Sequence, residues 1–261
     1  MTVAIRALDT LDELRAAQAL FQEVWRNPVP QVTAELLRAA EHAGCYVAGA
    51  YDGSRLVGAS FALLASGPGR EVRLHSHITG VLPDARGGNV GWALKLHQRG
   101  WSLDRGIEVV TWTFDPLVRR NAWFNVAKLG AVGVGYLVDF YGPMSDGLNA
   151  GEPSDRLLVE WHLSSPRVVA AVSGTPVPQP DDGVVVLDEV DAAPVVVGAA
   201  PAGGVALVRL PADVESLRAT DPAAARRWRV AVRDVLAPLL AGGGEVVAVT
   251  RAGDLAVSRR R

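Results

Sequence analysis

Residues 79–95 combine a strand end, a glycine-rich turn and the start of a helical pattern. They read Thr-Gly-Val-Leu-Pro-Asp-Ala-Arg-Gly-Gly-Asn-Val-Gly-Trp-Ala-Leu-Lys. The first turn of a helix has unpaired backbone N–H groups and the positive end of the helix dipole. Small residues let a phosphate group approach those N–H groups closely. The segment therefore predicts a cradle for a diphosphate, and an ordinary strand-to-helix turn is the alternative interpretation.

Two other phosphate-binding loops do not fit the sequence. A Walker loop needs Gly-x-x-x-x-Gly-Lys followed by Ser or Thr, whereas Lys95 lies four residues after Gly91. Gly130, Gly133 and Gly135 partly match a dinucleotide fingerprint. They follow a predicted helix and open a predicted strand, which is the wrong context for that motif.

His75 and His77 stand two residues apart on a predicted strand just before the turn. Side chains alternate along a strand, so both imidazoles are expected on one face. A histidine titrates near pH ~6.5, which suits a catalytic base at neutral pH. Either histidine could instead be a hydrogen-bonded interior residue. A metal pair is the weakest of the three interpretations, because no further ligand stands at a readable spacing, and no metal is expected.

Asp115 and Cys45 are two further residues whose side chains could take part in a reaction. Asp115 ends a predicted strand, where it could anchor a substrate or a water, although an Asp-Pro turn is its commoner role. Cys45 is the single cysteine, so no intrachain disulfide is possible. Its apolar neighbours favour a small core residue over a nucleophile.

The elements that must position these residues follow from hydrophobic periodicity. Strands are expected over residues 3–8, 46–51, 56–64, 71–82, 107–114, 131–140 and 156–163. Helices are expected over residues 11–25, 33–43, 91–104 and 117–128. A meander mixed with crossover helices predicts an α/β fold, with a central sheet of mixed direction flanked by helices.

The sequence changes character after residue 165. Residues 166–183 are expected to be a linker, and residues 184–261 a smaller α+β extension. Its main helix starts at Asp221-Pro222, buries Trp228 and Val232, and is expected to turn its arginines, Arg226, Arg227, Arg229 and Arg233, to solvent. About 80 residues are few for a free-standing domain. We expect the extension to pack against the first domain, residues 1–165, or against a second subunit in a homodimer.

Residues 1–165 resemble the GNAT superfamily of N-acetyltransferases, in element order and in two motifs. The superfamily's loop is Gln/Arg-x-x-Gly-x-Gly/Ala, and residues 86–91 match it at both ends, with Asn89 at the first glycine. Asparagine tolerates the left-handed backbone conformation. The later motif, Asn-x-x-Ala-x-x-x-Tyr-x-Lys-x-Gly-Phe, is similar to residues 119–131, which keep Ala122 and Lys-Leu-Gly but have Val126 at its tyrosine. Residues 141–144 and 155–161 look similar to a poorly characterised bacterial branch with a C-terminal extension.

The resemblance implies acetyl-CoA as cosubstrate. Its pyrophosphate would sit on the N–H groups of residues 86–91, and its pantetheine arm would pair like a strand with residues 80–82. The implied contacts are Gly80, Val81, Leu82, Arg86, Gly87, Gly88, Asn89, Val90, Gly91, Trp92 and Asn121. The cations available to the phosphates are Arg86, Lys95, Arg119 and Arg120.

The implied reaction is direct attack of a small-molecule amine on the thioester, which makes the protein an N-acetyltransferase. His75 and His77 are candidate bases, because some members of the superfamily carry a catalytic glutamate on that strand. Tyr141 could replace the acid that Val126 does not supply, although a packed aromatic residue is the alternative. The missing tyrosine also motivates a second hypothesis, a non-catalytic acyl-CoA-binding or regulatory module.

Composition argues against other partners. Only two of the 26 basic residues, Lys95 and Lys128, are lysines, which indicates a GC-rich bacterial genome rather than nucleic-acid binding. The formal net charge of −2 disfavours nucleic acid and membrane surfaces as partners. No stretch has the length of a signal peptide or a membrane span, so a cytoplasmic protein is expected.

Overall fold

A computed structural model describes residues 3–142, 153–175, 177–180, 182–201 and 203–259. These residues form two compact units. The first ends at Trp112, and the second begins at Thr113 and contains the remainder. Residue 165, where the sequence places the end of its first domain, lies inside the second unit.

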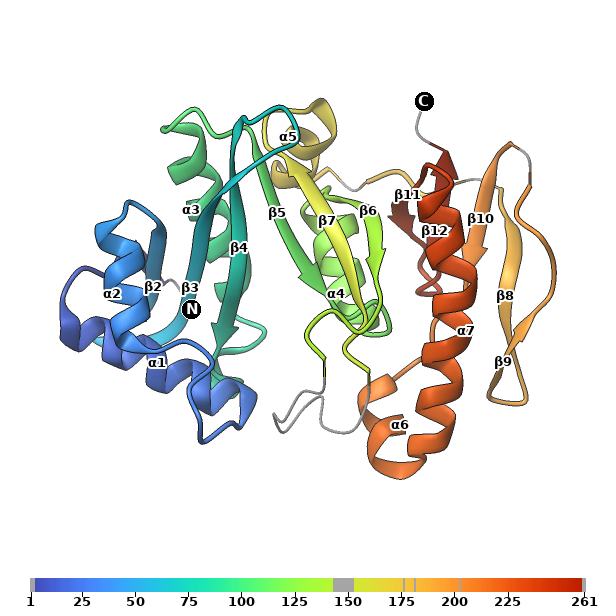
Figure 1. The fold of residues 1–261 in the computed structure, drawn as a ribbon, viewed down its shortest axis with the longest axis horizontal. Coiled ribbons are helices and arrows are strands. Elements are labelled where there is room, and N and C mark those ends of the chain that lie inside the picture. The colour runs from blue at the N-terminus through green and yellow to red at the C-terminus, as the bar shows by residue number, and fades with distance from the viewer. Residues whose placement is uncertain (1–2, 143–152, 176, 181, 202, 260–261) are drawn as a thin grey trace. The chain divides into compact units, whose positions relative to one another are not determined.

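The first unit is a sheet with three α-helices (Figure 1). Its strands are β1 (Ala4–Ala7), β2 (Tyr46–Asp52), β3 (Arg55–Ser66), β4 (Val72–Val81) and the start of β5 (Val109–Phe114), in that spatial order. Its helices are α1 (Leu11–Trp25), α2 (Ala34–His42) and α3 (Val90–Leu103), with a 3-10 turn, η1 (Pro83–Ala85), before α3. Neighbouring strands are antiparallel up to β4, and β4 pairs with β5 in parallel.

Local signals explain these elements. Thr10 and Glu13 form a capping box at the start of α1, where each side chain accepts a bond from the other residue's backbone. The apolar residues of α1 recur every three or four positions and are buried. Gly53 adopts a φ of 59° in the turn between β2 and β3, as the Asp-Gly pair predicts.

The second unit contains the remaining elements (Figure 1). The helices are α4 (Arg119–Ala122), the π-helical turn η2 (Trp123–Lys128), α5 (Pro166–Val172), α6 (Val214–Thr220) and α7 (Pro222–Ala241). The strands are β6 (Val132–Leu137), β7 (Arg156–His162), β8 (Val184–Val190), β9 (Ala193–Val196), β10 (Val205–Val208), β11 (Gly244–Val249) and β12 (Leu255–Arg259). They run β7-β6-β11-β12-β10-β8-β9 across one sheet. Strands before and after residue 165 therefore share a sheet.

Three details of the second unit differ from the expectations. The expected helix over residues 117–128 is one α-helical turn followed by the π-helical turn η2. The expected linker begins with α5, capped by the Ser165 hydroxyl, and α6 was not expected.

Within the described ranges, no helix combines the length and apolar composition that crossing a membrane requires.

Candidate functional site

The glycine-rich loop forms an open helix start in the first unit. Gly87 has a φ of 84°, which favours glycine, and a Cβ there would meet nothing within 4 Å. Asn89 is the N-cap of α3 with a φ of 59°, so it takes the left-handed conformation that the loop requires. The Asn89 side chain makes no capping bond. The first N–H groups of α3 are therefore not capped by it, and a phosphate could accept from them.

The four cations expected near the phosphates have different surroundings in the structure. Arg86 is exposed beside the loop and stays a candidate. Lys95 is only 5% exposed, so a phosphate-binding role for it is wrong. In the second unit, Arg119 donates to the carbonyls of Leu210 and Ala252, and Arg120 pairs with Glu215. These two arginines hold residues of the C-terminal extension.

The edge of β4 that leads to the loop is paired with β5 over only part of its length. β4 pairs with β5 where Leu74 lies opposite Val110 and His75 opposite Thr111. β4 then continues to Val81, and no further ladder pair joins these two strands in the described part of the chain. Such an edge offers backbone N–H and C=O groups to an extended ligand. It includes the implied pantetheine residues Gly80 and Val81.

A β-bulge places the two histidines. The pairing of β3 with β4 shifts so that Phe61 faces Ile78 and Ala62 faces Ser76, which leaves His77 as the extra residue. Bulges re-aim a side chain and are over-represented next to active sites. The rings of His75 and His77 lie 6.5 Å apart between centroids. The structure therefore brings both imidazoles together, although strict alternation would not have predicted the bulge.

His75 is the better oriented of the pair. Its Nδ1 lies 3.1 Å from the Thr111 hydroxyl, a bond that leaves Nε2 for another partner. His77 is exposed and packs edge to face with Phe61. Partial burial lowers the pKa of both imidazoles, and charge on His77 and Lys95 lowers the pKa of His75 further. Both histidines are therefore mainly neutral at pH 7 and able to accept a proton.

A polar group that sequence reasoning missed lies on the other face of β4. The Lys95 ammonium donates to the Ser76 hydroxyl (2.9 Å) and to Oε1 of Gln98 (3.1 Å), and stands 3.9 Å from the centre of the Trp112 ring. Burial lowers the pKa of Lys95 to about 7. A lysine inside an apolar helical pattern is the only sequence signal for this site.

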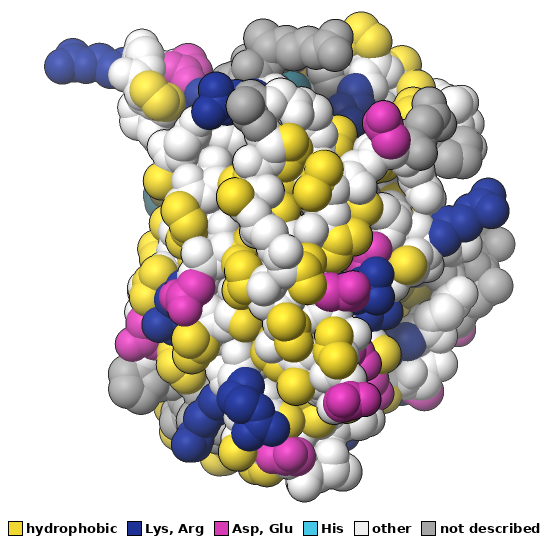
Figure 2. All heavy atoms as spheres, turned by 90° about the vertical axis from the view of Figure 1, so that its right-hand side faces the viewer, with side chains coloured by type: hydrophobic (Ala, Val, Ile, Leu, Met, Phe, Trp, Pro, Cys, Tyr) yellow, Lys and Arg dark blue, Asp and Glu magenta, His cyan; other side chains and the backbone are white. Residues whose placement is uncertain are grey.

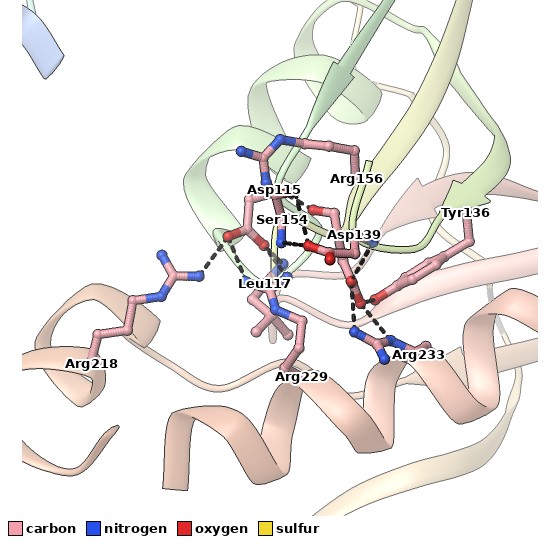
Figure 3. A network of polar contacts seen from close by, with 10 residues as sticks. Asp115, Leu117, Tyr136, Asp139, Ser154, Arg156, Arg218, Arg229 and Arg233 are labelled. Carbon is pink, nitrogen blue, oxygen red and sulfur yellow. Dashed lines mark hydrogen bonds and ion pairs between the residues drawn. The ribbon is translucent and has the colours of Figure 1, made fainter. Parts of the chain in front are cut away.

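The second unit holds a buried ionic network around Asp115 (Figure 3). Both carboxylate oxygens of Asp115 accept from Arg229, at 2.7 and 2.8 Å, and Arg218 of α6 adds another ion pair. Burial would raise the pKa of Asp115, but these two arginines outweigh it and hold the pKa well below its usual range. The N–H of Leu117 donates to the same carboxylate, as an Asp-Pro turn predicts. Asp115 therefore anchors α6 and α7.

A second buried carboxylate, Asp155, extends the network along α7, and Figure 3 labels its partners Tyr136, Asp139 and Arg233. Asp155 accepts two bonds from Arg233 (2.9 and 2.7 Å), one from the Tyr136 hydroxyl (2.7 Å) and one from the N–H of Asp139 (3.0 Å). Arg229 is 1% exposed and Arg233 is half-buried, so their expected position in solvent is wrong. Helical periodicity placed them on the solvent-facing side, because it carries no information about a buried acidic partner that is distant in sequence.

The remaining candidates belong to the second unit. Tyr141 is 44% exposed, and its hydroxyl lies 3.4 Å from that of Thr113. Asn121 is half-buried in the single turn of α4. Val126 is fully buried in η2, so the position of the motif's tyrosine is part of the core. Within the described residues, no three His, Cys, Asp or Glu side chains are grouped to hold a metal.

Comparison with known proteins identifies the fold. No protein-family model and no curated protein sequence matches the chain. An N-acetyltransferase from Staphylococcus aureus Mu50 is 15% identical over 62% of this chain and 99% of its own, with a TM-score of 0.52. Arabidopsis thaliana Naa50, in complex with the bisubstrate analogue CoA-Ac-MVNAL, is 19% identical over 61% of this chain and 98% of its own, with a TM-score of 0.50.

A third similar structure contains the expected cosubstrate. It is yncA from Salmonella typhimurium with its cofactor acetyl-CoA, 15% identical over 63% of this chain and 96% of its own, with a TM-score of 0.50. At such identities the similarity shows the fold. The chain has the GNAT fold, a mixed α/β sheet flanked by helices, as its motifs predict.

Proposed function

We propose that this GNAT-fold protein transfers the acetyl group of acetyl-CoA to an amine of a small molecule. The observation that carries the proposal is the combination of an open helix start at Asn89–Val90 with the unpaired edge of β4. The first suits a pyrophosphate and the second suits the amide groups of pantetheine. Both belong to the first unit, and both coincide with the residues that the motifs imply for acetyl-CoA.

The chemistry requires a base and a leaving group. The amine nitrogen attacks the thioester carbonyl carbon, the C–S bond breaks, and the base takes the proton that the amine loses. His75 suits this role because it is neutral and oriented by Thr111. A thiol with a pKa of about 8.5 leaves as a thiolate at a cost of roughly 2 kcal/mol at pH 7. A general acid therefore contributes little, and Tyr141 is the candidate for that smaller role.

A non-catalytic acyl-CoA-binding module is the second candidate function. The buried Val126 favours it, because the hydroxyl group of the family motif is absent there. The two functions differ in one measurement, the release of free thiol from acetyl-CoA in the presence of a panel of amines. Turnover with any amine eliminates the binding module. Binding without turnover across the panel supports it.

The first prediction tests acetyl-CoA binding itself. A Cβ at Gly91 would meet only Val81, at 3.9 Å, so glycine is not needed there for packing against its neighbours. Gly91→Trp should therefore fold and still place a large ring in the phosphate cradle. We expect calorimetric titration to show at least a hundredfold weaker acetyl-CoA binding, because a helix-start anion site requires close approach.

Gly100→Trp is the matched control for this variant. Gly100 lies in the same helix, is exposed, and has open space around its Cβ position. It should bind acetyl-CoA like the native protein. Unchanged binding by Gly91→Trp, or no binding by the native protein, would refute the proposed cosubstrate site.

A homodimer remains part of the proposal. β9 is the edge strand of the sheet in the second unit, and valines of β8 and β9 are exposed, namely Val184, Val190, Val195 and Val196. Figure 2 shows hydrophobic side chains gathered over one face of the molecule, with charged groups scattered between them. A group of exposed valines of this kind is compatible with a protein partner.

A further inference from the structure

Lys95 is a buried cation with neutral partners. Its ammonium contacts a hydroxyl, an amide oxygen and an indole ring, which belong to Ser76, Gln98 and Trp112. None of these groups carries a compensating negative charge. Burying an ammonium in this way disfavours its charged form, which explains its pKa of about 7. A methionine would fill the same space without that cost.

The position of Lys95 relative to the histidines is fixed by two paired strands. Ser76 stands between His75 and His77 on β4, and Trp112 follows Thr111 on β5. His75 lies opposite Thr111 in the parallel ladder and is bonded to it. Because side chains alternate along each strand, this pair faces one side of the sheet. Ser76 and Trp112 face the other side, where α3 brings Lys95 against both.

Among the residues that the structure describes, few other charged groups face these side chains. Leu63 of β3 is the other cross-strand neighbour of His75, and Thr111 faces it from β5. The charges that act on His75 are those of His77 and Lys95. On α3, His97 is engaged by the Tyr46 hydroxyl at 2.9 Å. Arg73 of β4 is paired with Glu71.

We propose that Lys95 is a positioning residue for acetyl transfer, which takes up a proton behind β4 and thereby keeps the imidazole of His75 free to accept one. This inference rests on the proposed function, with His75 as the base. As pH falls through about 7, Lys95 becomes charged. The charge on Lys95 then opposes protonation of the His75 imidazole. A charge on the imidazole opposes protonation of Lys95 to the same extent. Without Lys95, His75 would gain its proton at higher pH.

The second prediction measures this coupling without substrate. In the full-length protein with isotope-labelled histidine, NMR should show that Lys95→Met moves the titration midpoint of His75 to higher pH. The exposed His42 should not move. Lys128→Met is the matched control, because it removes the other lysine, which is exposed in the second unit, and should leave His75 unchanged. An unchanged or lower midpoint in folded Lys95→Met overturns the inference.

The native protein provides a test that does not depend on a variant folding. It contains only two lysines, so 15N-lysine labelling gives two side-chain signals to assign. The signal of Lys95 should titrate near pH 7. If neither lysine signal titrates below about pH 9, the inference is overturned, because the ammonium of Lys95 would then be unperturbed.

Activity separates this inference from the proposed function. In Lys95→Met, the acidic limb of the kcat/KM profile should move to higher pH by the shift that NMR measures. The loss should then be several-fold larger at pH 6 than at pH 8, while the Kd for acetyl-CoA stays unchanged. If NMR shows the coupling but no amine is acetylated, the proposed function fails alone. If turnover is intact and the His75 midpoint does not move, the role of Lys95 fails alone.

Discussion

The two histidines of β4 differ in what holds them. His75 is bonded through Nδ1 to Thr111, whereas His77 is the extra residue of a bulge and contacts Phe61 through its ring. A catalytic base must hold one geometry while it takes a proton. The bond to Thr111 supplies that restraint for His75 alone. At the scale of single residues, the structure therefore favours one of two candidates that the sequence left equal.

The third prediction distinguishes these histidines. His75→Gln should lower kcat/KM about a hundredfold, the lower end of what a positioned base contributes. His77→Gln should lower it less than tenfold and serves as the matched control, because it changes the same residue type two positions away. Steady-state rates of thiol release measure both. A larger loss in His77→Gln would assign the base to His77, and an equal loss would contradict the choice of His75 over His77.

The pH dependence expected of the native protein follows from the role proposed for the same residue. In the proposed reaction the base form of His75 is the active one, and it is lost as pH falls through the pKa of His75. Burial lowers that pKa below the ordinary histidine value, so activity should persist into more acidic solution than a typical histidine would allow. In His75→Gln this acidic limb should disappear from the kcat/KM profile.

At the scale of elements, α6 and α7 are fixed to the end of β5 by charge. Asp115 is 7% exposed and accepts from Arg229 of α7 and Arg218 of α6. Removing one partner of a buried ion pair leaves a charge in a medium of low dielectric constant, which commonly costs about 3–5 kcal/mol. The pair is therefore a structural requirement for the helices, whatever net energy its formation contributes.

The fourth prediction quantifies that requirement. Arg229→Met should lower the free energy of unfolding by about 3 kcal/mol at pH 7, measured by urea denaturation. Because the lowered pKa of Asp115 contributes stability above its ordinary value, that contribution is lost as pH falls below about 4. The difference between native protein and variant should shrink in that range.

Arg227→Met is the control for Arg229→Met. It lies on the same helix, and its pair with Asp221 is exposed at 3.8 Å. Such pairs contribute about 0–1 kcal/mol, so this variant should be nearly as stable as the native protein. Equal losses in the two variants would mean that burial of the Asp115 pair does not matter.

Which elements could be predicted depended on how local their causes are. The capping box of α1, the turn at Gly53 and the left-handed Asn89 follow from neighbouring residues, and the loop motif predicted the last of these. The bulge at His77 depends on the register between β3 and β4, which no short motif encodes. Arg229 and Lys95 were assigned to solvent or phosphate because their partners, Asp115 and Ser76, are distant in sequence. Pairing across the chain was the information that periodicity lacked.

At the scale of the whole molecule, the C-terminal extension shares a compact unit with residues 113–142 and 153–165. β11 pairs with β6 at Val246 and Gly133, and α7 supplies the arginines that face Asp115 and Asp155. These contacts cross residue 165 repeatedly. The extension therefore completes the core of the second unit, and we expect the two to fold together.

The fifth prediction is that a chain truncated after Ser164 does not fold. It would lack Arg229 and Arg233, so two buried carboxylates would lose these partners, and β6 would become an open edge. Circular dichroism and size-exclusion chromatography should show lost tertiary structure and aggregation. As a control, a protease site inserted between Gly174 and Gly183 and then cleaved should leave both pieces associated, because the β6–β11 pairing and the contacts of Arg229 and Arg233 remain. A truncated chain that is soluble, keeps its oligomeric state and is fully active would refute a structural role for residues 165–261.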